Sequence, residues 1–199
     1  MATRPAHADP EQVTRLLGHY ADATETDTIT GATWYADAFE HAERIADQCG
    51  ASVQSVAGAI AALSPLREWD RNVADAEQVA STFSTGGEVP MLHFGQNLDR
   101  ACKCLSGNNP DDVLGGPKVR AFYAAIMGDW SSVTIDRWAV QAAKGQAART
   151  GTPSAAQYRD LQAAYTEAAR SVGLEPAVFQ AIVWVTVRRT TQEQDDARM

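Results

Sequence analysis

The sequence predicts an all-α fold, a helical bundle in a single domain. Apolar residues recur at helical spacing along most of the chain, glycine or proline ends most of these stretches, and hardly any stretch has the alternation of a strand. With 199 residues, 45% apolar and 21% charged, the chain is long enough to bury a core and is not disordered as a whole. We expect the domain to cover 1–192, with an acidic helical lobe at about 1–90, a second lobe at about 93–150, C-terminal helices at 154–190 and a frayed polar tail at 193–199.

Capping residues place the helices of the N-terminal half. Asp9 followed by Pro10 has the pattern of an N-cap and a first-turn proline. Ser52 caps an alanine-rich stretch, which is thin enough for the centre of a bundle, and Ser64-Pro65 ends that stretch. The helices expected in this half are 10–23, 33–49, 53–63 and 69–83.

Glycines mark the helix ends of the C-terminal half. Gly107, Gly128 and Gly173 each follow an apolar periodic stretch, the position at which glycine commonly ends a helix. A short helical turn is expected at 111–114. The helices expected in this half are 94–105, 117–127, 135–148, 154–172 and 175–190.

The charge is unevenly divided along the chain. The net charge is −8, but residues 1–99 hold 5 basic and 15 acidic residues, whereas 100–199 hold 12 and 10. An acidic protein is a poor general binder of polyanions, yet basic groups that converge on one face can still hold nucleic acid with strong salt dependence. An ordinary acidic protein without such a face is the simpler interpretation of the charge.

Cysteine number and hydropathy exclude several classes of protein. Three cysteines, at 49, 102 and 104, suit a reducing compartment and are too few for a disulfide framework or a four-cysteine metal site. The longest strongly apolar stretch, 178–187, is far shorter than the roughly 20 residues of a membrane span. The N-terminus lacks the apolar core of a secretory signal. We therefore expect no metal, no cofactor and no membrane contact, and a cytoplasmic location.

The segment 114–138 contains the residues with the clearest chemistry. Gly115 and Gly116 form a tight turn just before a helix, where backbone N–H groups and the helix dipole suit a phosphate. Lys118 and Arg120 stand in the first turn of that helix. Asp136 follows Lys118 by 18 residues, at the start of the next helix. The intervening helix and loop can bring these two side chains into one cleft.

This pattern resembles the helix-hairpin-helix DNA glycosylase superfamily, which has the endonuclease III-like fold of base-excision repair. In that family a leucine-proline-glycine-apolar-glycine-x-lysine hairpin precedes the catalytic aspartate by a similar spacing. The segment 61–69, Ala-Ala-Leu-Ser-Pro-Leu-Arg-Glu-Trp, is similar to the family's leucine-serine segment, after which residues reach into the DNA. The chain departs from the family at Pro117, in place of a hairpin glycine, and at Arg137-Trp138, in place of threonine and histidine. It also resembles small uncharacterised proteins of bacteriophages that infect actinobacteria, so its cytoplasm would be that of the host.

The resemblance implies roles for individual residues. Lys118 would attack C1′ of a flipped nucleotide, and ionised Asp136 would stabilise the positive charge that develops there. A modified or damaged base in double-stranded DNA is the implied substrate. The residues expected to form the base pocket are Tyr123, Trp138 and Trp69. The residues expected to contact DNA are Gly115, Gly116, Lys118, Arg120, Arg137, Arg67 and Arg71.

Two other interpretations remain open. The chain can be a catalytically silent module that binds DNA or a host protein through the same fold, in which case Asp136 is only a helix cap and the acidic N-terminal lobe is the partner surface. It can also be a structural protein without a nucleic-acid role, which predicts no duplex binding even at low salt.

Overall fold

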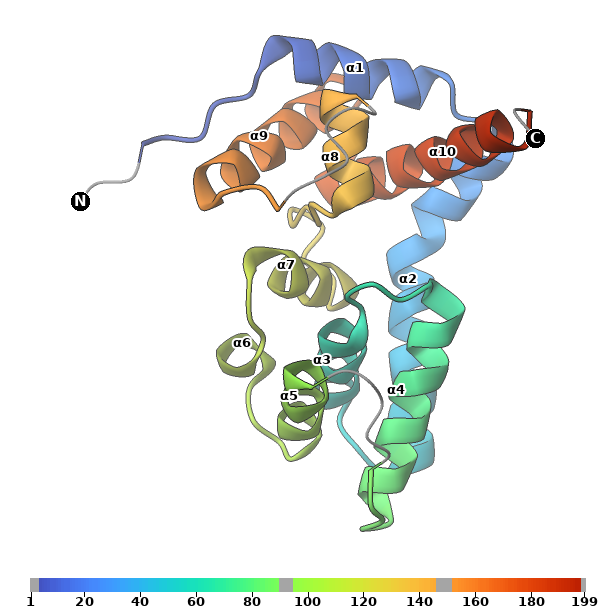
Figure 1. Cartoon of the computed structure of the whole chain (residues 1–199), viewed down its shortest axis with the longest axis vertical. Coiled ribbons are helices and arrows are strands. Elements are labelled where there is room, and N and C mark those ends of the chain that lie inside the picture. Colours follow the sequence, from blue (N-terminus) through green and yellow to red (C-terminus); the bar gives the residue numbers. More distant parts are fainter. Residues whose placement is uncertain (1–3, 90–94, 146–151, 198–199) are drawn as a thin grey trace. The chain divides into compact units, whose positions relative to one another are not determined.

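The computed structural model describes residues 4–89, 95–145 and 152–197, and these contain helices and no strand (Figure 1). The prediction of an all-α fold is therefore confirmed. The helices are α1 (Pro10–Ala21), α2 (Glu25–Cys49), α3 (Val53–Leu63), α4 (Trp69–Ser84), α5 (Gln96–Leu105), α6 (Pro110–Val113), α7 (Pro117–Ile126), α8 (Arg137–Lys144), α9 (Ala155–Ser171) and α10 (Pro176–Asp196).

Two helices are longer than the sequence analysis predicted. Helix α2 begins at Glu25 rather than at 33, because Thr24 and Asp27 cap its start reciprocally: the Asp27 N–H donates to Thr24 Oγ1 (3.1 Å) and the Thr24 N–H donates to Asp27 Oδ2 (3.0 Å). Helix α10 continues to Asp196, into the segment expected to fray. Its last turns are supported by a hydrogen bond from Gln192 Nε2 to Asp196 Oδ1 (2.9 Å).

The chain forms two compact units, and the second is inserted into the sequence of the first. Unit 1 comprises Met1–Tyr35 and Asp129–Met199, and unit 2 comprises Ala36–Gly128. Helix α2 contributes its first part to unit 1 and its remainder to unit 2. This division does not coincide with the lobes expected at 1–90, 93–150 and 154–190, because it depends on which helices pack together and not on their order in the chain.

The core of unit 1 lies among α1, α8, α9 and α10. Its largest fully buried side chains include Leu16, Tyr165 and Phe179, and the Tyr165 and Phe179 rings meet edge to face with centroids 6.2 Å apart. Gly31 of α2 lies against α10 so closely that a Cβ built on it would be 2.5 Å from Ile182 Cα. Glycine is therefore needed at this helix crossing.

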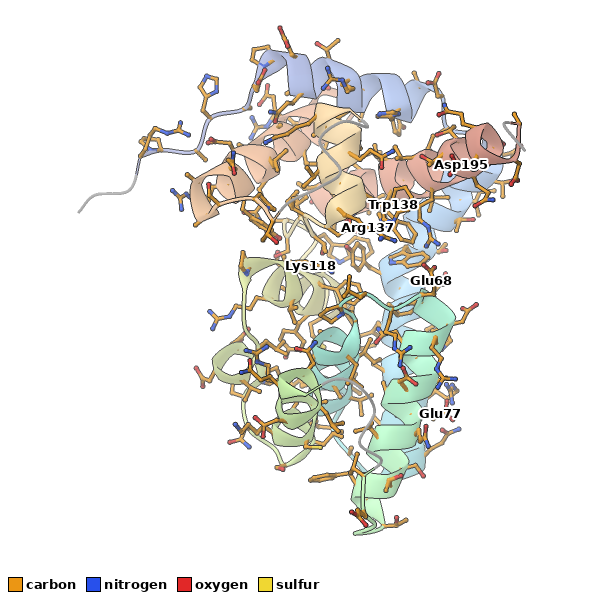
Figure 2. All side chains as sticks on the ribbon, viewed as in Figure 1. Glu68, Glu77, Lys118, Arg137, Trp138 and Asp195 are labelled. Atoms are coloured by element: carbon orange, nitrogen blue, oxygen red, sulfur yellow. The ribbon has the colours of Figure 1, made fainter. Side chains whose placement is uncertain are left out.

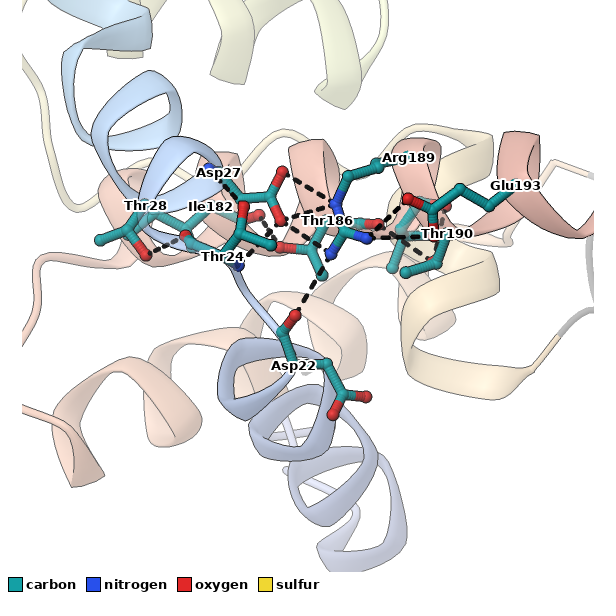
Figure 3. A network of polar contacts seen from close by, with 10 residues as sticks. Asp22, Thr24, Asp27, Thr28, Ile182, Thr186, Arg189, Thr190 and Glu193 are labelled. Atoms are coloured by element: carbon teal, nitrogen blue, oxygen red, sulfur yellow. Dashed lines mark hydrogen bonds and ion pairs between the residues drawn. The ribbon is translucent and has the colours of Figure 1, made fainter.

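A polar network in unit 1 joins α10 to the start of α2 (Figure 3). Arg189 Nε donates to Asp27 Oδ2 (2.9 Å), and Arg189 Nη2 donates to the Asp22 carbonyl (3.2 Å). Arg189 also pairs with Glu193 one turn further along α10. Asp27 is only 3% exposed, and burial alone raises its pKa; hydrogen bonds from Arg189 and Thr24 outweigh that effect and lower the pKa below its usual value.

Unit 2 is built around α3, which packs against α4, α5, α6 and α7. From Ser55 to Leu63 every residue of α3 is buried, as expected for a thin alanine-rich helix at the centre of a bundle. A Cβ built on Gly58 would be 2.9 Å from both Cys104 Sγ and Pro110 Cγ, so the small residue permits the approach of neighbouring helices. The side chain of Asn72 on α4 donates to the Ile60 carbonyl (3.1 Å).

Candidate functional site

The glycine hairpin of unit 2 lies between the four-residue helix α6 and helix α7. Gly116 is the N-cap of α7 and has φ 77°, a left-handed conformation that favours glycine, and no side chain caps this helix start. Arg120 folds back onto the hairpin and donates from Nε to the Leu114 carbonyl (2.7 Å). Lys118 is half-buried in the first turn of α7 (Figure 2). Uncapped N–H groups at a helix start, beside basic side chains, suit an anion.

Arg100 of α5 is a further basic residue at this hairpin, and the sequence analysis missed it. A Cβ built on Gly115 would be 2.8 Å from Arg100 Nη2, so the guanidinium occupies the space that a larger residue would need. Arg100 Nη1 also donates to Asn97 Oδ1 (3.3 Å). Its proximity depends on the packing of α5 against α6 and α3, which residue spacing does not reveal.

The turn between α3 and α4 carries an exposed leucine. Leu66 has φ 63°, which is costly for a residue with a branched side chain, and it is 95% exposed. Arg67 and Arg71, both expected to contact DNA, form ion pairs through Nε with opposite oxygens of Asp75, each at 3.0 Å. Asp75 is 1% exposed, so this pairing compensates a buried carboxylate and fixes the turn that presents Leu66.

Two residues expected in a base pocket have packing roles in unit 2. Trp69 meets Phe122 edge to face, with centroids 6.2 Å apart, and its ring also lies 5.9 Å from that of His41. Tyr123 is buried, and burial raises the pKa of its hydroxyl. Within unit 2 both rings thus contribute to the packing of α7 against its neighbours.

Asp136 of unit 1 is the N-cap of α8, and both of its carboxylate oxygens accept hydrogen bonds. Oδ1 accepts from the Ala139 N–H (2.8 Å) and Oδ2 accepts from Trp184 Nε1 (3.1 Å). The Trp184 ring packs against Trp34, with centroids 4.8 Å apart, and the Arg188 guanidinium lies 4.5 Å from its centroid. The carboxylate is thus held in a fixed orientation among aromatic rings and a cation.

A second cation and aromatic ring adjoin Asp136 in sequence. The Arg137 guanidinium lies 5.2 Å from the centroid of the Trp138 ring, within the range of a cation–π contact (Figure 2). Arg137 is exposed and Trp138 is half-buried. The start of α8 therefore combines a carboxylate, an arginine and a tryptophan, groups that can respectively stabilise a positive charge, bind a phosphate and stack on a base.

The expected partners Lys118 and Asp136 belong to different units, Lys118 to unit 2 and Asp136 to unit 1. Each has a defined environment in its own unit, and their meeting in one cleft stays a prediction. In the part of the chain that the structure describes, no group of three or more histidine, cysteine, aspartate or glutamate residues is placed to hold a metal ion. None of the described helices has the length and apolar character needed to cross a bilayer.

Comparison with known proteins places the chain in a family. No curated protein and no solved structure matches it. One family model matches residues 2–191, almost the whole chain, and its description reads "Family of unknown function (DUF7178)". Because the match covers far more than half of the chain, the chain belongs to this family of unknown function, DUF7178.

Proposed function

We propose that this protein binds duplex DNA through a helix-hairpin-helix motif and cleaves the N-glycosidic bond of a modified or damaged base, as a DNA glycosylase or lyase. The observation that carries the proposal is the hairpin before α7. Its helix start has no side-chain cap, and the first turn beyond it carries Lys118. Arg100 lies against Gly115, and the Arg120 side chain donates a hydrogen bond to the carbonyl of Leu114 in the hairpin. A DNA phosphate is the anion that fits this combination of backbone donors and cations.

The exposed turn at Leu66 supports the same proposal. Proteins that kink DNA insert apolar side chains, leucine among them, between base steps. Leu66 is almost fully exposed on a strained backbone that Arg67 and Asp75 hold in place. Such strain is unusual at a position without a role, because a glycine there would avoid it.

The proposed chemistry assigns one step to each charged residue. The Lys118 amine forms a bond to C1′ as the bond from C1′ to the base nitrogen breaks, and the base leaves with that electron pair and takes up the proton that the amine nitrogen loses. The bond from C1′ to the ring oxygen O4′ then opens, O4′ takes up a proton as the alcohol, and a Schiff base between Lys118 and C1′ remains, which is the group that borohydride reduces. The Asp136 carboxylate stabilises the positive charge at C1′. Its hydrogen bonds from the Ala139 N–H and the Trp184 indole hold the carboxylate ready for this role. No metal or cofactor takes part in these steps.

The DNA-binding part is tested by titrating a fluorescently labelled duplex with the protein at several salt concentrations. We expect Lys118→Ala to weaken binding and to reduce the salt slope by about 1, the value for one lost phosphate contact. Lys103→Ala is the matched control, since Lys103 lies in the same unit and pairs with Asp99 on the exposed face of α5. Equal effects of the two variants, or no duplex binding at low salt, would contradict the proposal.

The catalytic part is tested with duplexes that contain an abasic site or a modified base. Borohydride should trap a covalent adduct with the wild type and not with Lys118→Ala. Asp136→Asn should abolish base release while the helix start survives, because asparagine is as good an N-cap as aspartate. Asparagine has one acceptor oxygen where aspartate has two, so Asp136→Asn also loses the hydrogen bond from the Trp184 indole. Trp184→Phe is the control for this loss, because it removes the same hydrogen bond and keeps the carboxylate.

One observation favours a second candidate, a catalytically silent module that binds DNA or a host protein. Both oxygens of Asp136 already accept hydrogen bonds that stabilise unit 1, so the residue has a structural role without any reaction. This candidate predicts duplex or protein binding with neither a trapped adduct nor base release. The acidic residues among 1–99, which are divided between the two units, would then be the groups that a basic host protein contacts.

A further inference from the structure

We infer that Tyr158 is a positioning residue for Asp136: its hydroxyl holds the backbone of residues 133–135, and this segment fixes where the Asp136 carboxylate lies. The consequence for catalysis rests on the function proposed above, whereas the structural step can be measured without DNA. Residues 133–135 belong to no helix and are only 1–7% exposed. A buried segment without regular structure has to find partners for its backbone N–H and C=O groups elsewhere in the protein.

Tyr158 of α9 satisfies two of these backbone groups. Its hydroxyl accepts a hydrogen bond from the Ile135 N–H (3.1 Å) and donates to the Val133 carbonyl (3.4 Å). Among the described residues, the Ile135 N–H has no other acceptor. Gln162, one turn further along α9, donates from Nε2 to the same Val133 carbonyl (3.3 Å). The carbonyl therefore has two donors, and the N–H depends on Tyr158 alone.

The Tyr158 hydroxyl is itself held in place by the core of unit 1. The residue is 4% exposed, and burial raises the pKa of its hydroxyl to about 12, so at neutral pH the hydroxyl keeps the proton that it donates. A second buried hydroxyl supports the middle of the segment. Tyr35 donates to Gln180 Oε1 (2.8 Å), and its hydroxyl oxygen lies 3.2 Å from Thr134 Oγ1. All of these residues belong to unit 1.

The held segment leads directly into Asp136. Without the Tyr158 hydroxyl, the Ile135 N–H would be buried without an acceptor, and the cost of that state drives the segment toward another partner. Asp136 would move with its neighbour. Its hydrogen bond from the Trp184 indole (3.1 Å) would weaken first, because Trp184 is on α10 and does not move with the start of α8. Tyr158 thus acts on the proposed reaction through Asp136 and not by touching the DNA.

The structural step is tested by NMR on the full chain without DNA. The indole N–H signal of Trp184, assigned by its absence from Trp184→Phe, reports the hydrogen bond to Asp136. We expect Tyr158→Phe to shift this signal upfield and to speed its hydrogen exchange, because the bond to the carboxylate is weakened.

Tyr165→Phe is the matched control. Tyr165 is another buried tyrosine of α9, and its hydroxyl donates to the Ala139 carbonyl (3.1 Å). That carbonyl lies within α8, so the loss of the hydroxyl leaves no backbone N–H without an acceptor. This variant should leave the indole signal of Trp184 in place.

The catalytic step is tested with duplexes that carry uracil, hypoxanthine or thymine glycol, at saturating protein. On the base that the wild type releases fastest, Tyr158→Phe should slow release about tenfold, as expected for a misplaced catalytic group. The Kd for the duplex should stay unchanged, because the hydroxyl bonds only to the backbone of Val133 and Ile135. If the wild type releases none of these bases, the proposed function fails and the indole signal alone decides the inference.

Three results would overturn the inference: an unmoved indole signal in folded Tyr158→Phe, an equal shift in Tyr165→Phe, or slower base release that is matched by weaker duplex binding. If Tyr158→Phe does not fold, Gln162→Leu takes its place, because the half-buried Gln162 holds the same Val133 carbonyl. An upfield shift of the Trp184 signal in that variant supports the inference, and an unmoved signal overturns it.

Discussion

Replacing Gly31 with alanine is expected to destabilise unit 1 by forcing α2 away from α10. The new Cβ would lie 2.5 Å from Ile182 Cα and 2.6 Å from Ile182 N. Carbon atoms in contact are about 3.5–4.0 Å apart, so the helices would have to separate by about 1 Å at their crossing. Overpacking of this kind costs about 1–3 kcal/mol. The cost at Gly31 lies at the upper end, because the new Cβ meets backbone atoms of Ile182, which cannot move aside as a side chain can. Alanine gains about 1 kcal/mol in helix propensity, which leaves a net loss of about 2 kcal/mol.

The measurement is denaturant unfolding followed by circular dichroism, with thermal unfolding as a second readout. Gly18→Ala is the matched control: Gly18 is in α1 of the same unit, and outside its own helix no described atom lies within 4 Å of a Cβ built on it. This control should raise the free energy of unfolding by up to about 1 kcal/mol. For a chain of this size the loss at Gly31 corresponds to a fall of about 4–8 °C in melting temperature. Equal stability of the two variants would show that the close crossing does not exist.

Three further predictions concern the network, the thiols and the exposed turn. The pKa of Asp27 is lower in the folded than in the unfolded protein, so its stabilising contribution is present above a pH of about 4 and is lost as the pH falls through the lowered pKa. Urea unfolding measured at a series of pH values should show this loss of stability. In Asp27→Asn this part of the pH dependence should disappear. Cys104 is buried, and burial raises the pKa of its thiol to about 11, so an alkylating reagent at neutral pH should label it only after the protein unfolds. The half-buried Cys49 should react in the native protein. Labelling of Cys104 before unfolding would contradict its buried position. Leu66→Gly should change the free energy of unfolding by less than about 1 kcal/mol, because relief of the positive φ offsets the flexibility of glycine, yet it should weaken duplex binding; unchanged affinity would remove the turn from the proposed interface.

Local sequence signals predicted the helices well where the cap and the stop are adjacent to the helix. Ser52 and Ser64-Pro65 bracket α3, and its observed bounds, Val53–Leu63, are those expected. The start of α2 was missed because Thr24 and Asp27 were not recognised as a reciprocal cap. The division into two units was also missed, since it arises from contacts between segments far apart in the chain.

The same distinction applies to the candidate site. The tight turn at Gly116 and the position of Asp136 at a helix start follow from residue type and position, and both were foreseen. The indole of Trp184 reaches Asp136 from 48 positions away, and the approach of Arg100 to the hairpin depends on helix packing. Neither contact has a signature in residue spacing. The backbone conformation of Leu66 was equally hidden, because leucine is not a residue that predicts a positive φ.

The insertion of one unit into the other sets an order of events on the ribosome. All residues of unit 2 leave the ribosome before the second part of unit 1 has been made. The hydroxyl of Tyr35, for example, finds its acceptor at Gln180, 145 residues later. At a synthesis rate of about 5–20 residues per second, the N-terminal segment waits about 7–30 s for that partner. During this delay the apolar face of α1, with Leu16, lacks the helices α8, α9 and α10 that cover it in the finished protein, so a holding chaperone has its best opportunity there.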